Sequence, residues 1–155
     1  MGFKNVADLV PLNPSYPDAL NPVRKERVIV PFQVLRSNTT PVKVAVLPAD
    51  ATILGFQYFI QTPSNATTTA IVTLTGQGVG PQGQTFAFGS QSVLAAAGNT
   101  GWMNATVNIL TGIFNLERAP ATQTSGDIII YATYSETGTA STTGGPFYFV
   151  IDYTR

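Results

Sequence analysis

Hydrophobic and polar residues alternate along this 155-residue chain in short segments that are typical of β-strands. From Val42 to Val46, and again from Ile128 to Tyr134, apolar side chains recur at every second position, as they do when one face of a sheet is buried. Further segments are rich in β-branched and aromatic residues and are separated by Gly, Pro, Asn, Ser and Thr. The expected strands lie at residues 27–35, 41–47, 52–60, 69–75, 84–90, 127–135 and 146–154, with another within 102–118. About eight strands predict an all-β chain with a single β-sandwich or jelly-roll domain.

Two segments modify this picture. Pro31 lies inside the first expected strand, and because proline cannot donate to a ladder, that strand is expected to be an edge strand or to be bulged there. Residues 92–99 (SVLAAAGN) begin with a Ser suited to an N-cap and continue with good helix formers, which predicts a helix of barely two turns between strands.

The first 26 residues follow a different pattern, from which we predict an extended arm over 1–26 in front of a β-sandwich domain over 27–155. Four prolines lie in this segment, and each favours extended geometry in the residue before it. The arm also carries apolar side chains, which a plain linker would seldom need, and a basic cluster follows them. As candidate contacts with a partner protein we therefore name Phe3, Leu9, Leu12, Tyr16, Leu20, Arg24, Lys25 and Arg27.

The last expected strand places consecutive aromatic residues, Phe147, Tyr148 and Phe149, on both of its faces. At least one of them must face solvent, be covered by a loop or be buried by a partner. A platform for stacking nucleic-acid bases would interleave such rings with Arg or Lys, whereas only Arg155 is near. A protein interface is the better interpretation, and Phe147 and Phe149 join the candidate contacts.

Charge is scarce, because Lys and Arg number 8 and Asp and Glu number 8 among 155 residues, where about a quarter is usual. From Val44 to Asn115 the only charged side chain is Asp50. Uncharged polar groups can pair across an interface at a lower desolvation cost than unpaired ions, so we expect assembly rather than catalysis. A net charge of zero gives no support to nucleic acid or an anionic membrane as a partner.

The chain has no Cys and no His, which removes thiolate nucleophiles, the usual general base and the commonest zinc ligands. Its carboxylates are dispersed, although folding could still bring two together as in a glycosidase. Residues 78–83 match G-x-G-x-x-G, but Pro81 interrupts the motif and no acid follows until Glu117, so we interpret the segment as a hairpin turn rather than a dinucleotide site. We predict no enzyme, cofactor or metal site. The chain also lacks a secretory leader and a long apolar run, so a soluble protein made in the cytoplasm is expected.

Five segments in a fixed order carry a resemblance to a known family. They are PVKVAVLPADATILGFQYFIQTP (41–63), NATTTAIVTLTG (65–76), SVLAAAGNTG (92–101), SGDIIIYATYS (125–135) and FYFVIDY (147–153). This order resembles small virion structural proteins of tailed bacteriophages, the capsid decoration or cement proteins. The resemblance implies a non-enzymatic β-rich subunit that binds the major capsid protein on the capsid surface, often as a homotrimer, and reinforces the shell. The resemblance does not extend to the arm, and it does not assign a role to any individual residue.

Our leading hypothesis is therefore a capsid cement protein located in the virion. The alternative is a phage tail, baseplate or fibre component that contacts a host surface glycan through its Thr- and Gly-rich loop tips, at 67–69 and 139–145.

Overall fold

Nine β-strands form the part of the chain that the computed structural model describes, which is residues 26–48, 51–78, 85–95, 99–103, 114–115 and 127–154. The strands are β1 (Arg27–Val34), β2 (Val42–Leu47), β3 (Thr52–Ile60), β4 (Thr69–Gly78), β5 (Thr85–Ser92), β6 (Thr100–Trp102), β7 (Phe114–Asn115), β8 (Ile128–Thr137) and β9 (Phe147–Thr154). The expected strands are confirmed, and β7 lies in the segment where a further strand was predicted. Among the described residues, no helix is long and apolar enough to cross a membrane.

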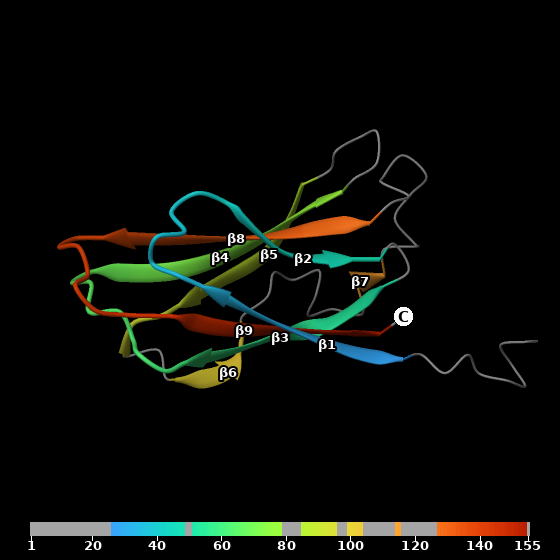
Figure 1. Ribbon diagram of the computed structural model, residues 1–155, viewed down its shortest axis with the longest axis horizontal. Helices are drawn as coiled ribbons and strands as arrows, with labels where there is room; N and C mark the ends of the chain where they lie inside the picture. Colours follow the sequence, from blue (N-terminus) through green and yellow to red (C-terminus); the bar gives the residue numbers. More distant parts are fainter. Residues whose placement is uncertain are drawn as a thin grey trace, which may run out of the picture.

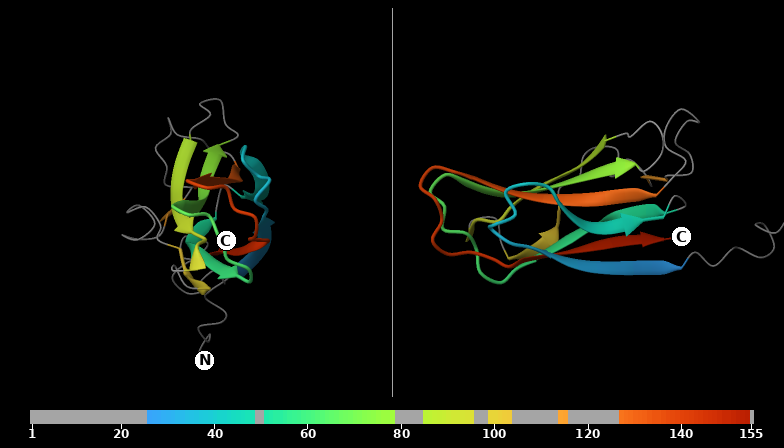
Figure 2. Two further views of the ribbon diagram at one scale, coloured as in Figure 1. Left: turned by 90° about the vertical axis from the view of Figure 1, so that its left-hand side faces the viewer. Right: turned by 45° about the horizontal axis from the view of Figure 1, so that its top comes forward.

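The strands form two antiparallel sheets that pack face to face (Figures 1 and 2). In sheet A the order is β1-β9-β3-β6, with β7 also paired to β3, and in sheet B it is β2-β8-β4-β5. β8 and β9, which are the last two strands in the sequence, therefore lie inside their sheets. The predicted β-sandwich is confirmed.

The core lies between the sheets and is built by the alternation seen in the sequence. Along β9, Phe147, Phe149 and Ile151 are fully buried. Aromatic pairs join the two sheets: the ring of Phe147 stacks on Tyr134 of β8 with centroids 5.6 Å apart, and Phe56 of β3 meets Phe88 of β5 at 5.4 Å. Fully burying one such side chain contributes about 1.5–3 kcal/mol, so these cross-sheet contacts are a main source of the sandwich's stability.

β1 is an edge strand, as Pro31 predicts. Its only sheet neighbour in the described chain is β9, and the register from Arg27 with Thr154 to Val34 with Phe147 has no shift. Of the two outcomes allowed for Pro31, the edge is observed and the bulge is not. In sheet A the register shift falls instead between β3 and β9, at Ile53 and Gly55.

Two smaller sequence predictions have different outcomes. β4 and β5 are antiparallel neighbours on either side of the G-x-G-x-x-G segment, so that segment connects a hairpin, as interpreted. The helix predicted over 92–99 does not begin as expected, because Ser92 ends β5 and Leu94 forms an isolated bridge with Ser64. The Ser92 hydroxyl still accepts the Leu94 amide at 3.5 Å, as an N-cap would. Residues 96–98 lie outside the described chain.

Candidate protein interface

Most of the candidate contact residues lie outside the described part of the chain and remain predictions. These are the residues of the arm: Phe3, Leu9, Leu12, Tyr16, Leu20, Arg24 and Lys25.

The two aromatic candidates of β9 point into the core and not toward a partner. Phe147 and Phe149 are both 0% exposed, and the ring of Phe149 stacks on Phe32 with centroids 5.6 Å apart. Tyr148 is half-buried on the opposite side of the strand. The expectation of aromatics on both faces of β9 therefore holds, but the ring that a partner could reach belongs to Tyr148. Phe147 and Phe149 lie on the inner side of the strand.

The outer surface of sheet A exposes large apolar side chains from three of its strands, β1, β3 and β6. Ile29 of β1 is 57% exposed, Phe59 of β3 is 49% exposed and Trp102 of β6 is 57% exposed. The strand register brings most of the outward residues together in two rows that cross the sheet, and Ile29 lies in the next row, opposite Asp152. We call this surface the aromatic face, and its members are Ile29, Pro31, Gln33, Gln57, Phe59, Trp102, Tyr148 and Val150.

Gly55 allows the indole ring of Trp102 to lie against the sheet. A Cβ atom at position 55 would be 2.7 Å from Cζ3 and 2.9 Å from Cε3 of Trp102, closer than real side chains pack. Only a glycine leaves room for the ring there. One side of the indole therefore rests on the backbone of β3, while more than half of the residue remains exposed.

A charge pair lies beside these rings. Asp152 of β9 is opposite Gly55 in the register, and its side chain is only 3% exposed. The Arg27 guanidinium donates from Nε to Oδ1 of Asp152 at 2.8 Å and from Nη2 to Oδ2. The hydrogen bonds to this carboxylate, and then its negative charge, raise the pKa of Arg27. Because a buried carboxylate without a partner is strongly unfavourable, Arg27 has a structural role here in addition to the contact role predicted for it.

The aromatic face is shallow and carries little net charge. A groove of about 280 Å³ runs between β1 and β9, lined by residues that include Pro31, Gln33, Tyr148 and Val150. The Arg27 and Asp152 side chains neutralise each other at its end. Exposed aromatic rings, an Arg and few other charges are the composition of protein interfaces at their centre.

The outer surface of sheet B differs in chemistry. Hydroxyl groups line it, and some pair across strands, as do Thr73 with Ser90 at 3.0 Å and Thr69 with Thr137 at 2.7 Å. The two outer surfaces of the sandwich thus have different characters, and among the described side chains only those of sheet A present a cluster of exposed rings.

The Thr- and Gly-rich loop tips, which the alternative hypothesis assigned to glycan contact, bind each other. The side-chain oxygen Oδ1 of Asn65 accepts hydrogen bonds from the backbone amides of Thr142 at 2.9 Å and Thr143 at 3.0 Å. The side-chain nitrogen Nδ2 of Asn65 donates to the Thr142 hydroxyl at 3.0 Å. The Thr139 amide donates to the Thr67 hydroxyl at 2.7 Å. Several polar groups that a sugar would need at the tips are therefore occupied within the chain.

A second hydrogen-bond network lies beneath the tips. The hydroxyls of Tyr134 and Ser141 each donate to Oε2 of Glu136 at 2.6 Å. The Arg36 guanidinium donates to the backbone carbonyl of Ser141 at 2.7 Å. The Ser64 hydroxyl lies 3.1 Å from the Tyr134 hydroxyl. The hydrogen bond from Ser141, and then that from Tyr134, lower the pKa of Glu136. Burial, followed by the hydrogen bond to Glu136, raises the pKa of Tyr134. The network joins three loops at one end of the sandwich.

Two of the described carboxylates, Asp127 and Glu136, lie too far apart to form a catalytic pair. Asp127 precedes β8 and Glu136 lies near its other end, about 30 Å away at the rise of an extended strand. Asp152 is bound by Arg27. Within the described ranges, no group of three or more acidic, His or Cys side chains could hold a metal ion.

Comparisons with known proteins give a structural likeness but no sequence relative. No protein-family model matches the sequence, and no curated protein matches it significantly. A chain in the "Acidic stable capsid structure of Helicobacter pylori bacteriophage KHP30" superimposes with a TM-score of 0.52 and 11% identity over 84% of this chain and 93% of that chain.

Two structures of infectious bursal disease virus, from strains Gx and Gt, give TM-scores of 0.41 and 0.39 at 13% and 12% identity. They match 85% and 84% of this chain but only 30% and 32% of their own chains. At these identities the comparisons concern the fold alone. The chain shares its β-sandwich fold with a chain in a bacteriophage capsid structure.

Proposed function

We propose that this protein is a non-enzymatic structural component of a virion, and that it decorates and cements the capsid by binding the lattice of the major capsid protein. The fold is the first support. The likeness to the KHP30 chain covers most of both chains, so that chain contains little beyond the same sandwich.

The aromatic face is the observation that carries the proposal. Ile29, Phe59 and Trp102 leave about half or more of their surface in water, and the neighbouring Arg27 and Asp152 cancel in charge. Contiguous exposed apolar surface of this kind marks an interaction site on a soluble domain. We assign it to contact with a neighbouring subunit of the shell.

The arm supplies a second contact in this proposal. Its apolar side chains and its Arg24 and Lys25 precede β1, which begins at the edge of the sheet that carries the aromatic face. Two linked contacts raise the effective concentration of each other, so modest affinities combine into firm attachment. Self-association, with a trimer favoured, is part of the same proposal.

Stabilisation of the shell follows from binding alone. A protein that binds the assembled lattice and not its free subunits stabilises the lattice by mass action, in proportion to the logarithm of its concentration over its Kd. Many copies, each bound weakly, sum to a large effect, and no chemical step is required.

The test uses capsids assembled without the protein, to which purified variants are added. Deleting residues 2–23 should leave the sandwich folded but lower both the occupancy and the heat resistance of the capsids. Ile29→Asp should do the same, because it places an unpaired charge on the aromatic face.

The matched control is Ser135→Asp, which adds the same charge at an exposed position on the outer surface of sheet B. Full occupancy and unchanged heat resistance with the deletion and with Ile29→Asp would refute the proposal. Electron microscopy of the virion that placed the protein on the tail would favour the alternative role.

A further inference from the structure

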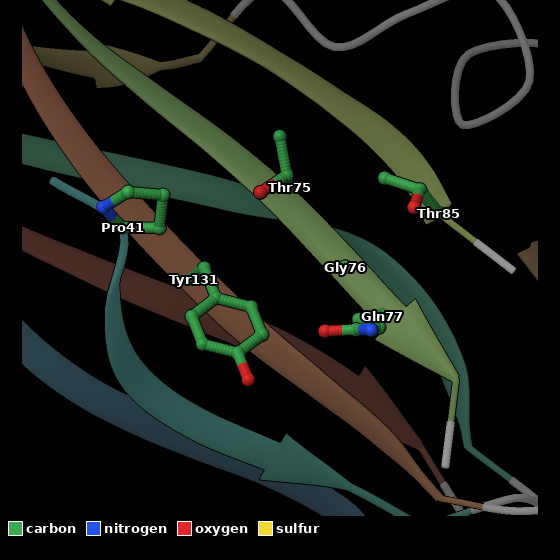
Figure 3. Close-up of a pocket in the computed structure, with 6 residues that line it drawn as sticks. All are labelled: Pro41, Thr75, Gly76, Gln77, Thr85 and Tyr131. Atoms are coloured by element: carbon green, nitrogen blue, oxygen red, sulfur yellow. The ribbon is translucent and has the colours of Figure 1, made fainter. Parts of the chain in front are cut away.

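A groove of about 330 Å³ lies on the outer surface of sheet B, on the opposite side of the sandwich from the aromatic face (Figure 3). Strands β4, β5 and β8 and the residue before β2 contribute to it. Its lining residues are Pro41, Thr75, Gly76, Gln77, Thr85 and Tyr131. The volume falls at the lower end of the range of small-ligand sites, about 300–1,000 Å³.

The strand register explains why these side chains meet. Tyr131 of β8 pairs with Thr75 of β4, and Gln77 pairs with Thr85 of β5, so residues from three strands converge on one patch. The Tyr131 side chain is half-buried and Gln77 is exposed. Figure 3 shows the Gln77 amide directed toward the Tyr131 ring.

The polar groups of the groove have no partner in the described part of the chain. No described residue forms a hydrogen bond with the side chains of Thr75, Gln77, Thr85 or Tyr131, whereas the hydroxyls of Thr73 and Ser90 on the same surface pair with each other. An amide offers both donors and acceptors, and a hydroxyl offers one donor together with acceptor sites. Within a small area the groove therefore presents four uncharged groups that can exchange hydrogen bonds with a ligand.

We propose that this groove binds a neutral saccharide of one or two pyranose units. A pyranose ring has an apolar face of C–H groups and a rim of hydroxyls, each both a donor and an acceptor. The half-buried Tyr131 ring supplies an apolar surface for the C–H face of the sugar. Gln77 and the two threonines supply hydrogen-bond partners for the sugar hydroxyls. All lining residues are uncharged, so none of them can pair with an ionic ligand to compensate its desolvation.

This site replaces the loop tips as the place of glycan contact. At the tips, Asn65 and Thr67 are engaged by the facing loop, whereas the polar side chains of the groove have no hydrogen-bond partner among the residues that the structure describes. The inference does not depend on the proposed capsid role, but the two are compatible. A molecule attached through the aromatic face would leave sheet B accessible on the other side.

The test measures saturation-transfer difference NMR on the full chain, with methyl glucoside, methyl galactoside, N-acetylglucosamine, maltose and cellobiose as probes at millimolar concentration. We expect transfer to at least one probe, with a Kd in the range of about 0.1–10 mM, which is 3–5 kcal/mol of binding free energy. Gln77→Ala should weaken it at least fivefold and Tyr131→Ala at least tenfold.

Tyr148→Ala, on the aromatic face, is the matched control and should bind as the wild type does. Because the Gln77 side chain is exposed, Gln77→Ala should fold normally. This variant therefore tests the inference even if Tyr131→Ala does not fold. Absence of transfer to every probe would overturn the inference, as would transfer that both groove variants leave unchanged. Glucuronic acid is added as an acidic probe. Transfer to it alone, and its loss in Lys43→Ala, on the strand beside Tyr131, would equally contradict a neutral ligand.

Discussion

Truncation of Phe59 is the sharpest test of the aromatic face. Phe59 lies on β3, inside sheet A, with 49% of its surface exposed and its ring 6.2 Å from that of Tyr148. A partner that covers the face would bury the exposed half. Phe59→Ala should therefore weaken attachment to the capsid.

The magnitude follows from the exposed area. A Phe ring buries on the order of 200 Å² when fully covered, so about 100 Å² remains for a partner to bury. At about 25 cal/mol per Å² this corresponds to about 2.5 kcal/mol and to a roughly 70-fold rise in Kd. A central aromatic side chain in an interface typically costs a similar amount on truncation.

The assay is titration of capsids that lack the protein, with bound protein quantified after sedimentation. The variant also loses the buried half of the ring, so its thermal unfolding must be followed in parallel and binding measured where it is fully folded. Ile71→Ala, a half-buried apolar residue on the outer surface of sheet B, is the control and should change the Kd little. A Kd for Phe59→Ala within threefold of the wild type would refute the assignment of this face to a partner.

Two further predictions concern the stability of the sandwich. Gly76→Ala should destabilise it by about 1–3 kcal/mol in urea unfolding, because the new Cβ would lie 2.5 Å from a ring carbon of the fully buried Phe88. Gly101→Ala should destabilise it less, because its Cβ would come no closer than 3.0 Å to the hydroxyl and 3.2 Å to the ring of the half-buried Tyr58. Equal losses would contradict the packing argument. Hydrogen bonds lower the folded-state pKa of Glu136 below its ordinary value of 4.5. The ionised Glu136 therefore contributes fully to folding stability above that pH, and this contribution is lost as the pH falls through the lowered pKa. Between pH 7 and pH 3, the melting temperature of Glu136→Gln should fall less steeply than that of the wild type. If both melting temperatures fall equally, the Glu136 network does not determine the acid sensitivity of the fold.

The sequence predicted the strands well because each is marked by local features. The pattern in β8 and the glycine- and proline-rich connections depend on neighbouring residues alone, so the boundaries of the seven strands predicted by range agree within three residues. β6 was not predicted. Pro31 likewise predicted, from its own chemistry, either a sheet edge or a bulge, and the edge is observed. The pairing of β9 with both β1 and β3 had no such local signal, since it joins segments more than 80 residues apart.

The candidate interface was predicted less well, for a related reason. Alternation along Phe147, Tyr148 and Phe149 shows that both faces of the strand are aromatic, but only the packing of the second sheet decides which face is inside. One signal was available: Val28, Ile29 and Val30 form a continuous apolar run in a strand that Pro31 marks as an edge. Such a run must leave one apolar side chain on the outer surface, and Ile29 is that residue.

The position of β9 between β1 and β3 also bears on how the chain folds as it is synthesised. Arg27 and Asp152 are separated by 125 positions, and neither β1 nor β3 can form its hydrogen bonds to β9 until residues 147–154 have left the ribosome. Contacts between such distant segments make folding slow, and unpaired strands are prone to aggregate in the meantime. A nascent chain that stalls before β9 would lack the strand that joins β1 to the rest of sheet A. For this chain, completion of the last strand is the event that allows the sheet to form.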